Sequence, residues 1–359
     1  MAWLVSRFKK YERFMSALAM IAGFTFDNYF FQRIDHFATQ LVLLAYLTFA
    51  TSAIVLLHYI DSCSEPAKAL RKLHSFLVMA TQFAFGGLWS AFLIFYGRSA
   101  VLAASWPFLL ILSAMLVGNE VFRDYRDRLA FTCTLLFFAL FSYMIFVVPI
   151  VTGTMGRRIF LLSGVPALLL FSAVVFVLWC VGPERIRQGW RAIVLGALGV
   201  YACINVFYFT SILPPLPLAL TQAGVFYSVA KDGDLYRAVG GQQGWYGTTG
   251  ARPVLRVAPD EGLSVYSAVF APIQLRTEIV HIWQRYDDAA RSWHQESVVK
   301  FPITGGREGG YRGYSVKSNP RAGQWRVDIE TTEGRLIGRV VFAVAAGANA
   351  AARRAEVLH

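Results

Sequence analysis

Apolar residues along the first two thirds of the chain form long runs that are separated by short polar segments. A helix needs about 20 apolar residues to cross ~30 Å of hydrocarbon. Six runs reach this length: 37–60, 75–97, 99–118, 129–151, 159–181 and 192–213. A weaker run from Phe14 to Phe31, interrupted by Asp27 and Asn28, follows a basic segment and has no small-residue cleavage site after it, so we predict an uncleaved first span. Residues 1–213 are therefore expected to form an α-helical polytopic membrane bundle of about seven transmembrane helices.

From residue 214 onward, the period of the apolar residues changes from helical to alternating. Prolines at the start of this part cannot continue a helix and favour an extended, stiff connector over 214–223. The alternating segments predict these strands: 224–231, 235–239, 253–257, 263–271, 276–286, 292–300, 311–317, 324–331 and 336–344. Short strands with regular turn signals predict an all-β, immunoglobulin-like sandwich over 224–345. The tail over 346–359 is expected to be disordered.

The alternation is clearest in QWRVDIETTEGRLIGRVVFAV. One side of the predicted strand carries Trp325, Val327 and Ile329. The other side carries the charged residues Arg326, Asp328 and Glu330. Residues 332–334 are then predicted to form the turn of a hairpin.

Basic residues give the chain a net charge of +12 and also orient the predicted spans. With the N-terminus inside, the inner segments hold these basic residues: Arg7, Lys9, Lys10, Arg13, Lys68, Arg71, Lys72, Arg123, Arg126, Arg128, Arg185, Arg187 and Arg191. The outer loops hold Arg33, Arg98, Arg157 and Arg158. This 13-to-4 division follows the positive-inside rule, and an odd number of spans then places everything after residue 213 outside. The chain is thus predicted to be a multi-pass membrane protein with a cytoplasmic N-terminus and no role in binding nucleic acid. Its C-terminal domain is placed outside, which means the periplasm in a bacterium, or the extracellular face if there is one membrane.

Composition and motifs argue against most kinds of chemistry. A chain with 56% apolar and 16% charged residues fits many membrane spans. The sequence has no HExxH, GxSxG, P-loop or GxGxxG pattern of the required context, and it has no acidic residue near the middle of a predicted span, which argues against an ion-coupled pump. The four cysteines form no CxxC pair. His58 and His74 could approach each other, but no haem motif supports them, so no metal, cofactor or catalytic residue is predicted.

The turn between the first two spans holds Asp27, Arg33 and Asp35 close to the expected outer membrane surface. One interpretation is a local Asp–Arg arrangement that caps two helices, with aromatic neighbours in the interfacial belt. The other is a polar site for a lipid headgroup.

A second candidate site lies in the predicted β domain. His281 and Trp283 share one face of a strand, Trp293 on the next strand is expected near Trp283, and Tyr311 and Tyr314 follow. One interpretation is that the tryptophans fill the core of the sandwich. If they are exposed instead, the row of aromatic residues would suit a sugar ring or a protein partner.

The short-looped spans, DNYFFQRID, ILPPLPLAL, EIVHIWQRYD and GQWRVDIETTEGRLIGRVVF together resemble one family over most of the chain. This family is a group of bacterial inner-membrane proteins whose C-terminal β domain has no known function. The His-x-Trp and Gly-x-Trp-Arg-Val-Asp elements are the most specific parts of the resemblance. It implies an architecture and a compartment, and it carries no activity and no catalytic residues.

Two hypotheses about function follow from the sequence. The first is a non-enzymatic envelope protein whose β-sandwich binds a protein partner or glycan, as an accessory subunit of a membrane complex. The second is a protein that handles membrane lipids or lipid-linked glycans, with the headgroup at Asp27, Arg33 and Asp35.

Overall fold

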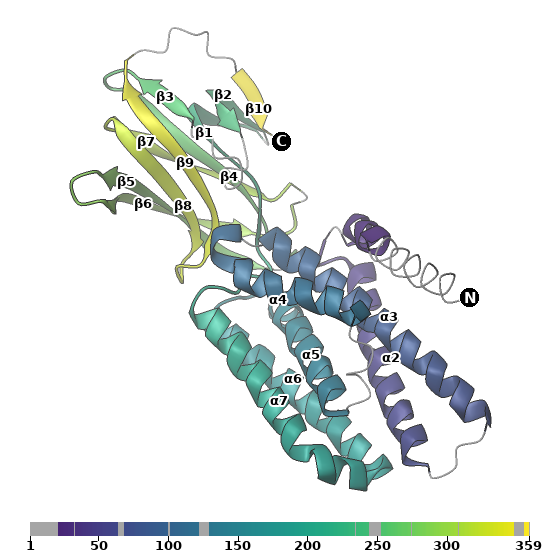
Figure 1. The fold of residues 1–359 in the computed structure, drawn as a ribbon. Coiled ribbons are helices and arrows are strands. Elements are labelled where there is room, and N and C mark those ends of the chain that lie inside the picture. Colours follow the sequence, from purple (N-terminus) through teal and green to yellow (C-terminus); the bar gives the residue numbers. More distant parts are fainter. Residues whose placement is uncertain are drawn as a thin grey trace, which may run out of the picture. The chain divides into compact units, whose positions relative to one another are not determined.

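The computed structural model describes residues 21–31, 33–63, 68–99, 101–121, 129–233, 235–243, 253–273, 275–307, 309–347 and 355–358. Its labelled helices are α2 (Phe37–Ser62), α3 (Lys68–Ser99), α4 (Leu102–Val121), α5 (Leu129–Thr152), α6 (Arg157–Val181) and α7 (Pro183–Phe209) (Figure 1). Residues 21–30 are also helical. These helices form the N-terminal bundle that the apolar runs predict.

Five helices are long and apolar enough to cross a membrane, which confirms the predicted spans at α2, α3, α5, α6 and α7. The apolar part of α4, Ala104–Gly118, is shorter than these five. The predicted first span lies partly outside the described residues. So do the basic residues before it and those between α4 and α5.

The packing of the bundle follows from where its aromatic residues lie. Rings of α3, α4 and α5 meet in the interior, where Tyr96 lies 4.7 Å from Phe108 and 4.9 Å from Phe146 between ring centroids. By contrast, α6 and α7 expose large apolar side chains such as Leu169 and Leu195. An exposed apolar surface of this extent on long helices is expected where the surrounding solvent is lipid.

Within the described residues, ten strands follow the bundle. They are β1 (Ala219–Asp232), β2 (Leu235–Gln243), β3 (Val254–Val257), β4 (Gly262–Phe270), β5 (Arg276–Asp287), β6 (Ser292–Thr304), β7 (Tyr311–Ser318), β8 (Gly323–Thr331), β9 (Leu336–Ala346) and β10 (Ala355–Leu358). One sheet has the order β10-β2-β1-β4-β7 and the other the order β3-β9-β8-β5-β6. We call them the first and second sheets, and together the β domain. All described pairs are antiparallel except β3 with β9.

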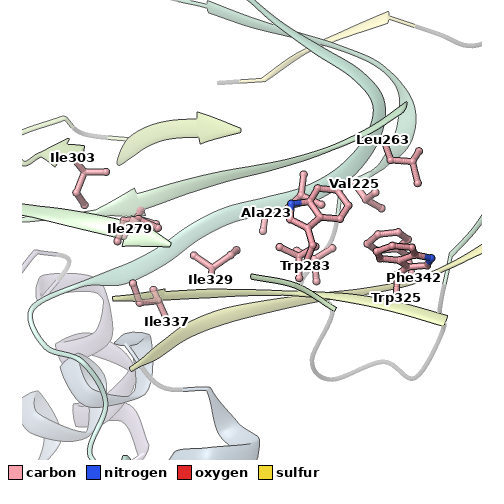
Figure 2. Close-up of a cluster of buried hydrophobic side chains, with 14 of the residues drawn as sticks. Ala223, Val225, Leu263, Ile279, Trp283, Ile303, Trp325, Ile329, Ile337 and Phe342 are labelled. Carbon is pink, nitrogen blue, oxygen red and sulfur yellow. The ribbon is translucent and has the colours of Figure 1, made fainter. Parts of the chain in front are cut away.

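Both sheets contribute to one apolar core. Val225 and Leu263 of the first sheet lie in the same buried cluster as Trp283, Ile329 and Phe342 of the second (Figure 2). The alternation in the sequence fixes which residues enter this core, because successive side chains of a strand point to opposite faces. The predicted inward face of 324–331 is confirmed.

The predicted hairpin turn is also confirmed. β8 and β9 pair antiparallel, and Gly334 in their turn has φ +76°, a conformation that glycine adopts without strain.

Two boundaries differ from the prediction. β1 begins at Ala219, so the second half of the predicted connector is strand. The predicted disorder of the tail is wrong for residues 355–358, which form β10 on the edge of β2. A pairing between segments more than 100 residues apart leaves no local signal in four residues of sequence.

The contacts divide the chain into two units. The first contains most of the helical residues, and the second contains the strands together with residues 98–106 and 149–159. In the second unit, the guanidinium of Arg335 lies 3.3 Å from the ring centroid of Tyr208 and donates to the Tyr208 carbonyl oxygen at 2.9 Å. Glu333 accepts a hydrogen bond from the backbone N–H of Arg157. Through these contacts, the β8–β9 turn holds Tyr208 near the end of α7 and Arg157 at the start of α6.

Candidate functional site

The five predicted site residues of the β domain do not lie on one face. His281 and Trp283 share a face, as the alternation predicts, but both side chains are completely buried between the sheets. The hypothesis that these two belong to an exposed recognition face is therefore wrong. β5 is an interior strand, paired with β6 on one side and β8 on the other, so its inward face contributes to the core.

His281 lies in a closed hydrogen-bond network. Trp283 Nε1 donates to Ser315 Oγ at 2.9 Å, and Ser315 Oγ lies 2.8 Å from His281 Nδ1. The hydroxyl of Ser315 can thus donate its hydrogen to Nδ1, which places the histidine hydrogen on Nε2, 2.8 Å from Ser267 Oγ. Burial lowers the pKa of His281 to about 3. The Ser–His pairs resemble a nucleophile and its base, but no substrate reaches a completely buried side chain, so the network is structural.

Trp293 lies on the opposite face of the second sheet from Trp283. The register of β5 and β6 shifts between Trp283 and Gln284, so that Glu296 is an extra residue in β6. The extra residue shifts by one the pairing of the β6 residues that precede Glu296, and Trp293 thus becomes the partner of Tyr286. The expectation that Trp293 lies near Trp283 is therefore wrong.

Tyr311 and Tyr314 belong to β7 in the first sheet. Tyr311 packs against the main core, whereas Tyr314 packs against a smaller cluster that includes Tyr236 and Tyr266. These two tyrosines are thus separated from Trp293.

The outer face of the second sheet carries a group of charged and aromatic residues around Trp293. The Arg326 guanidinium lies 4.5 Å from the Trp293 ring centroid, and the Tyr286 ring meets Trp293 edge-on at 5.2 Å. Arg326 also donates to Gln284 Oε1. We call the set Gln284, Tyr286, Trp293, Arg326, Asp328 and Arg339 the Trp293 patch.

An ion pair lies at one side of the Trp293 patch. Arg339 binds both carboxylate oxygens of Asp328, with Nη2 to Oδ2 at 2.8 Å. The Asp328 side chain is only 4% exposed, whereas Arg339 is 33% exposed. Strand register brings the two together, because Asp328 is the direct partner of Arg339 across β8 and β9. A bidentate pair of this kind is held in one geometry, and Arg339 is its more exposed partner.

The charges of the Trp293 patch influence one another. Hydrogen bonding to Asp328 raises the pKa of Arg339. Burial, and then the neighbouring Arg339, lowers the pKa of Arg326. Burial and the Asp328 carboxylate raise the pKa of the adjacent Glu330. Two guanidinium groups thus remain close together because a buried carboxylate lies between them.

The sequence contained a partial signal for the Trp293 patch. Its alternation placed Arg326 and Asp328 on the outward face of a strand, and that placement is correct. It could not show which strands are neighbours, so the pairs Asp328–Arg339 and Arg326–Gln284 were missed.

The turn before α2 holds a local Arg33–Asp35 pair, but the N-cap residue of α2 is His36 and no described side chain caps this helix. Arg33 binds both oxygens of Asp35, from Nε at 3.1 Å and from Nη2 at 2.9 Å. The Asp35 side chain is 4% exposed. Asp27 is half-buried in the preceding helix, beside the buried hydroxyl of Ser90 but without a hydrogen bond of good geometry between them. The guanidinium that a headgroup would need is thus engaged by the chain's own carboxylate.

His58 and His74 do approach each other, and both line a cavity of about 50 Å³ between α2, α3, α5 and α7. His58 Nε2 faces the carbonyl oxygens of Leu178 and Gly182, at 3.1 and 3.3 Å. His74 Nε2 lies 3.1 Å from Asp61, which also binds Arg185. Both Nε2 atoms thus have partners within the chain and tie helix ends together, whereas His58 Nδ1 is buried with no hydrogen-bond partner among the described residues.

The described residues thus place the chain in the class of multi-pass membrane proteins that carry a C-terminal β domain, here made of two five-stranded sheets. Residues 276–344, which run from β5 to β9, match a family described as a protein of unknown function (DUF2914). No curated protein matches the chain. One solved structure that is similar is a Pseudomonas fluorescens alkylpurine DNA glycosylase AlkC bound to DNA containing an abasic site analog, at 11% identity over 84% of this chain and 96% of that one. Its TM-score of 0.20 is too low to carry any argument. The Trp293 patch lies entirely within the matched segment.

Proposed function

We propose that this chain is a non-enzymatic envelope protein of the bacterial inner membrane, whose periplasmic, immunoglobulin-like β domain binds a partner protein through the Trp293 patch. In this role it is an accessory subunit of a membrane complex. The observation that carries the proposal is the Trp293–Arg326 stack beside the Asp328–Arg339 pair on a solvent-facing side of the second sheet. The compartment rests on the distribution of basic residues among the loops.

A protein partner suits the Trp293 patch better than a glycan does. Sugar rings stack on a free aromatic face, whereas the guanidinium of Arg326 lies over the ring of Trp293. Tryptophan, tyrosine and arginine are the residue types most enriched at the centres of protein interfaces. Paired charges held in fixed positions also favour a partner with complementary charges.

Recognition by the face of the sheet is favoured over addition of a strand to its edge at β6. This edge strand carries Pro302, which offers no N–H, and it is bulged at Glu296. Charged residues such as Lys300 also lie along it. These are the features by which proteins prevent strands from pairing at an open edge.

The alternative, a lipid headgroup site at Asp27, Arg33 and Asp35, has less support. Arg33 and Asp35 form a bidentate pair, and a phosphate would have to compete with Asp35 for the guanidinium.

The proposal is tested by photo-crosslinking in cells. A photoreactive residue in place of Val298 sits on the outer face in the same cross-strand row as Ile282 and Asp328. We expect it to give one discrete adduct, which Trp293→Ala or Arg326→Ala reduces at least tenfold, as expected when a residue at the centre of an interface is truncated.

Arg237→Ala is the matched control, because this exposed arginine lies on β2 in the other sheet. It should leave the adduct unchanged. An adduct that resists protease but is cleaved by periodate would identify a glycan and overturn the choice of partner. Equal adducts in all variants would remove the Trp293 patch from the binding site.

A further inference from the structure

The edge of β2 is occupied by a short strand from a distant part of the chain. β10 pairs antiparallel with β2, with Ala355 opposite Val239 and Leu358 opposite Tyr236. The ladder joins four residue pairs. The segment that links β9 to β10, residues 348–354, lies outside the described part of the chain.

One side chain anchors this strand. Leu358 is completely buried in a small cluster whose walls include Phe226 of β1, Tyr236 of β2 and Tyr266 of β4. The rings of Tyr236 and Tyr266 lie 5.6 Å apart between centroids. This cluster is separate from the main core between the sheets.

The other three residues of β10 contribute little burial. Ala355, Glu356 and Val357 are exposed, and Val357 is 43% exposed. The strand is therefore held by backbone hydrogen bonds and by one aliphatic side chain in an aromatic pocket. This arrangement matches the way an extended peptide adds to a sheet edge, where the ladder supplies affinity and side-chain pockets supply specificity.

We propose that the edge of β2, with the pocket that Leu358 fills, is a binding site for an extended segment of a partner polypeptide that carries a large aliphatic anchor residue. Residues 355–358 are its intramolecular ligand. A partner's strand takes the same place when it displaces them. The site is independent of the Trp293 patch, which lies on the other sheet, so either proposal can fail without the other.

Physical reasons make this exchange feasible. The backbone ladder is the same for any extended sequence, so a partner needs to reproduce only the anchor. A tethered segment benefits from an effective concentration in the millimolar range, which a partner must overcome with a longer ladder or a second contact. By this reasoning β10 blocks weak, non-specific strands but yields to a specific one.

The test uses the full chain in lipid nanodiscs, with its four native cysteines replaced by serine and with Val239→Cys. The probe is a peptide of residues 353–359 that carries cysteine in place of Ala355. Because Val239 and Ala355 are direct partners, the two thiols lie at a separation that a disulfide can span. With Leu358→Asp in the protein, the chain's own strand loses its anchor, and we expect the peptide to form the mixed disulfide at least tenfold faster than when Leu358 is present.

Two controls separate binding from accidental oxidation. A second peptide, with Asp in place of Leu358, should label the protein at least tenfold more slowly. Arg237→Cys, which is out of register with the cysteine of the peptide, should also be labelled more slowly than Val239→Cys. Hydrogen–deuterium exchange of β5 and β8 should be unchanged by Leu358→Asp, which shows that the β domain remains folded.

Equal labelling by both peptides, or the same rate with and without Leu358→Asp, would overturn the proposal. Disulfide-linked dimers in a mixture of Val239→Cys chains with Ala355→Cys chains would also overturn the choice of occupant, because they would show exchange between copies.

Discussion

Replacement of Trp283 by alanine is expected to lower the free energy of opening of β5 and β8 by about 3–5 kcal/mol, the usual range for a large aromatic residue removed from a core. The reason is the position of Trp283 between the sheets, where its ring meets Trp325 and Phe342 edge-on at 6.4 and 6.1 Å. The substitution removes these contacts and leaves a cavity that the two sheets cannot fully close. Native-state hydrogen–deuterium exchange of the full chain in nanodiscs measures this quantity strand by strand.

Two further variants show whether packing is the cause. Trp283→Phe keeps most of the apolar volume but loses the hydrogen bond to Ser315, and this loss should cost about 1–2 kcal/mol beyond the cost of the smaller ring. Trp293→Ala removes an aromatic residue from the outer face and should cost about 1 kcal/mol or less. If Trp293→Ala destabilised the β domain as much as Trp283→Ala, the assignment of one tryptophan to the core and the other to the surface would be incorrect.

Acid is expected to destabilise the β domain through His281, by about 3 kcal/mol between pH 7 and pH 4 at 1.36 kcal/mol per pKa unit. The folded pKa is about 3, below the ordinary value of 6.5. The unfolded chain therefore binds a proton that the folded chain does not, and stability falls as pH decreases from about 6.5 toward the folded pKa. The measurement is the opening free energy of β5 as a function of pH, corrected for the intrinsic pH dependence of amide exchange.

His281→Gln provides the control, because glutamine is polar but does not titrate. Its opening free energy should lose most of this pH dependence even though the variant is less stable at pH 7. Glu330 acts in the opposite direction, since its raised pKa means that the folded state takes up a proton first and gains stability as pH falls. An unchanged pH profile in His281→Gln would show that another group causes the acid sensitivity.

The sequence predicted most of the secondary structure, because each signal was local. A run of apolar residues long enough to cross hydrocarbon identifies a span without knowledge of its neighbours, and alternation identifies a strand and its two faces. For this reason α2, α5 and α6, and the strands from β4 to β9, lie close to their predicted bounds. The prediction for the tail was wrong because β10 forms only by pairing with β2, which lies more than 100 residues away in the sequence.

The candidate site was less predictable than the strands that hold it. The sequence alone determined that His281 and Trp283 share a face and that Arg326 and Asp328 project from an outward face. Only the tertiary structure decided that the first pair is enclosed between two sheets, since enclosure depends on what packs over a strand. It also decided, through one extra residue at Glu296, that Trp293 lies beside Arg326 rather than beside Trp283. Register and bulges arise from pairing between strands, and no single strand carries that information in its own residues.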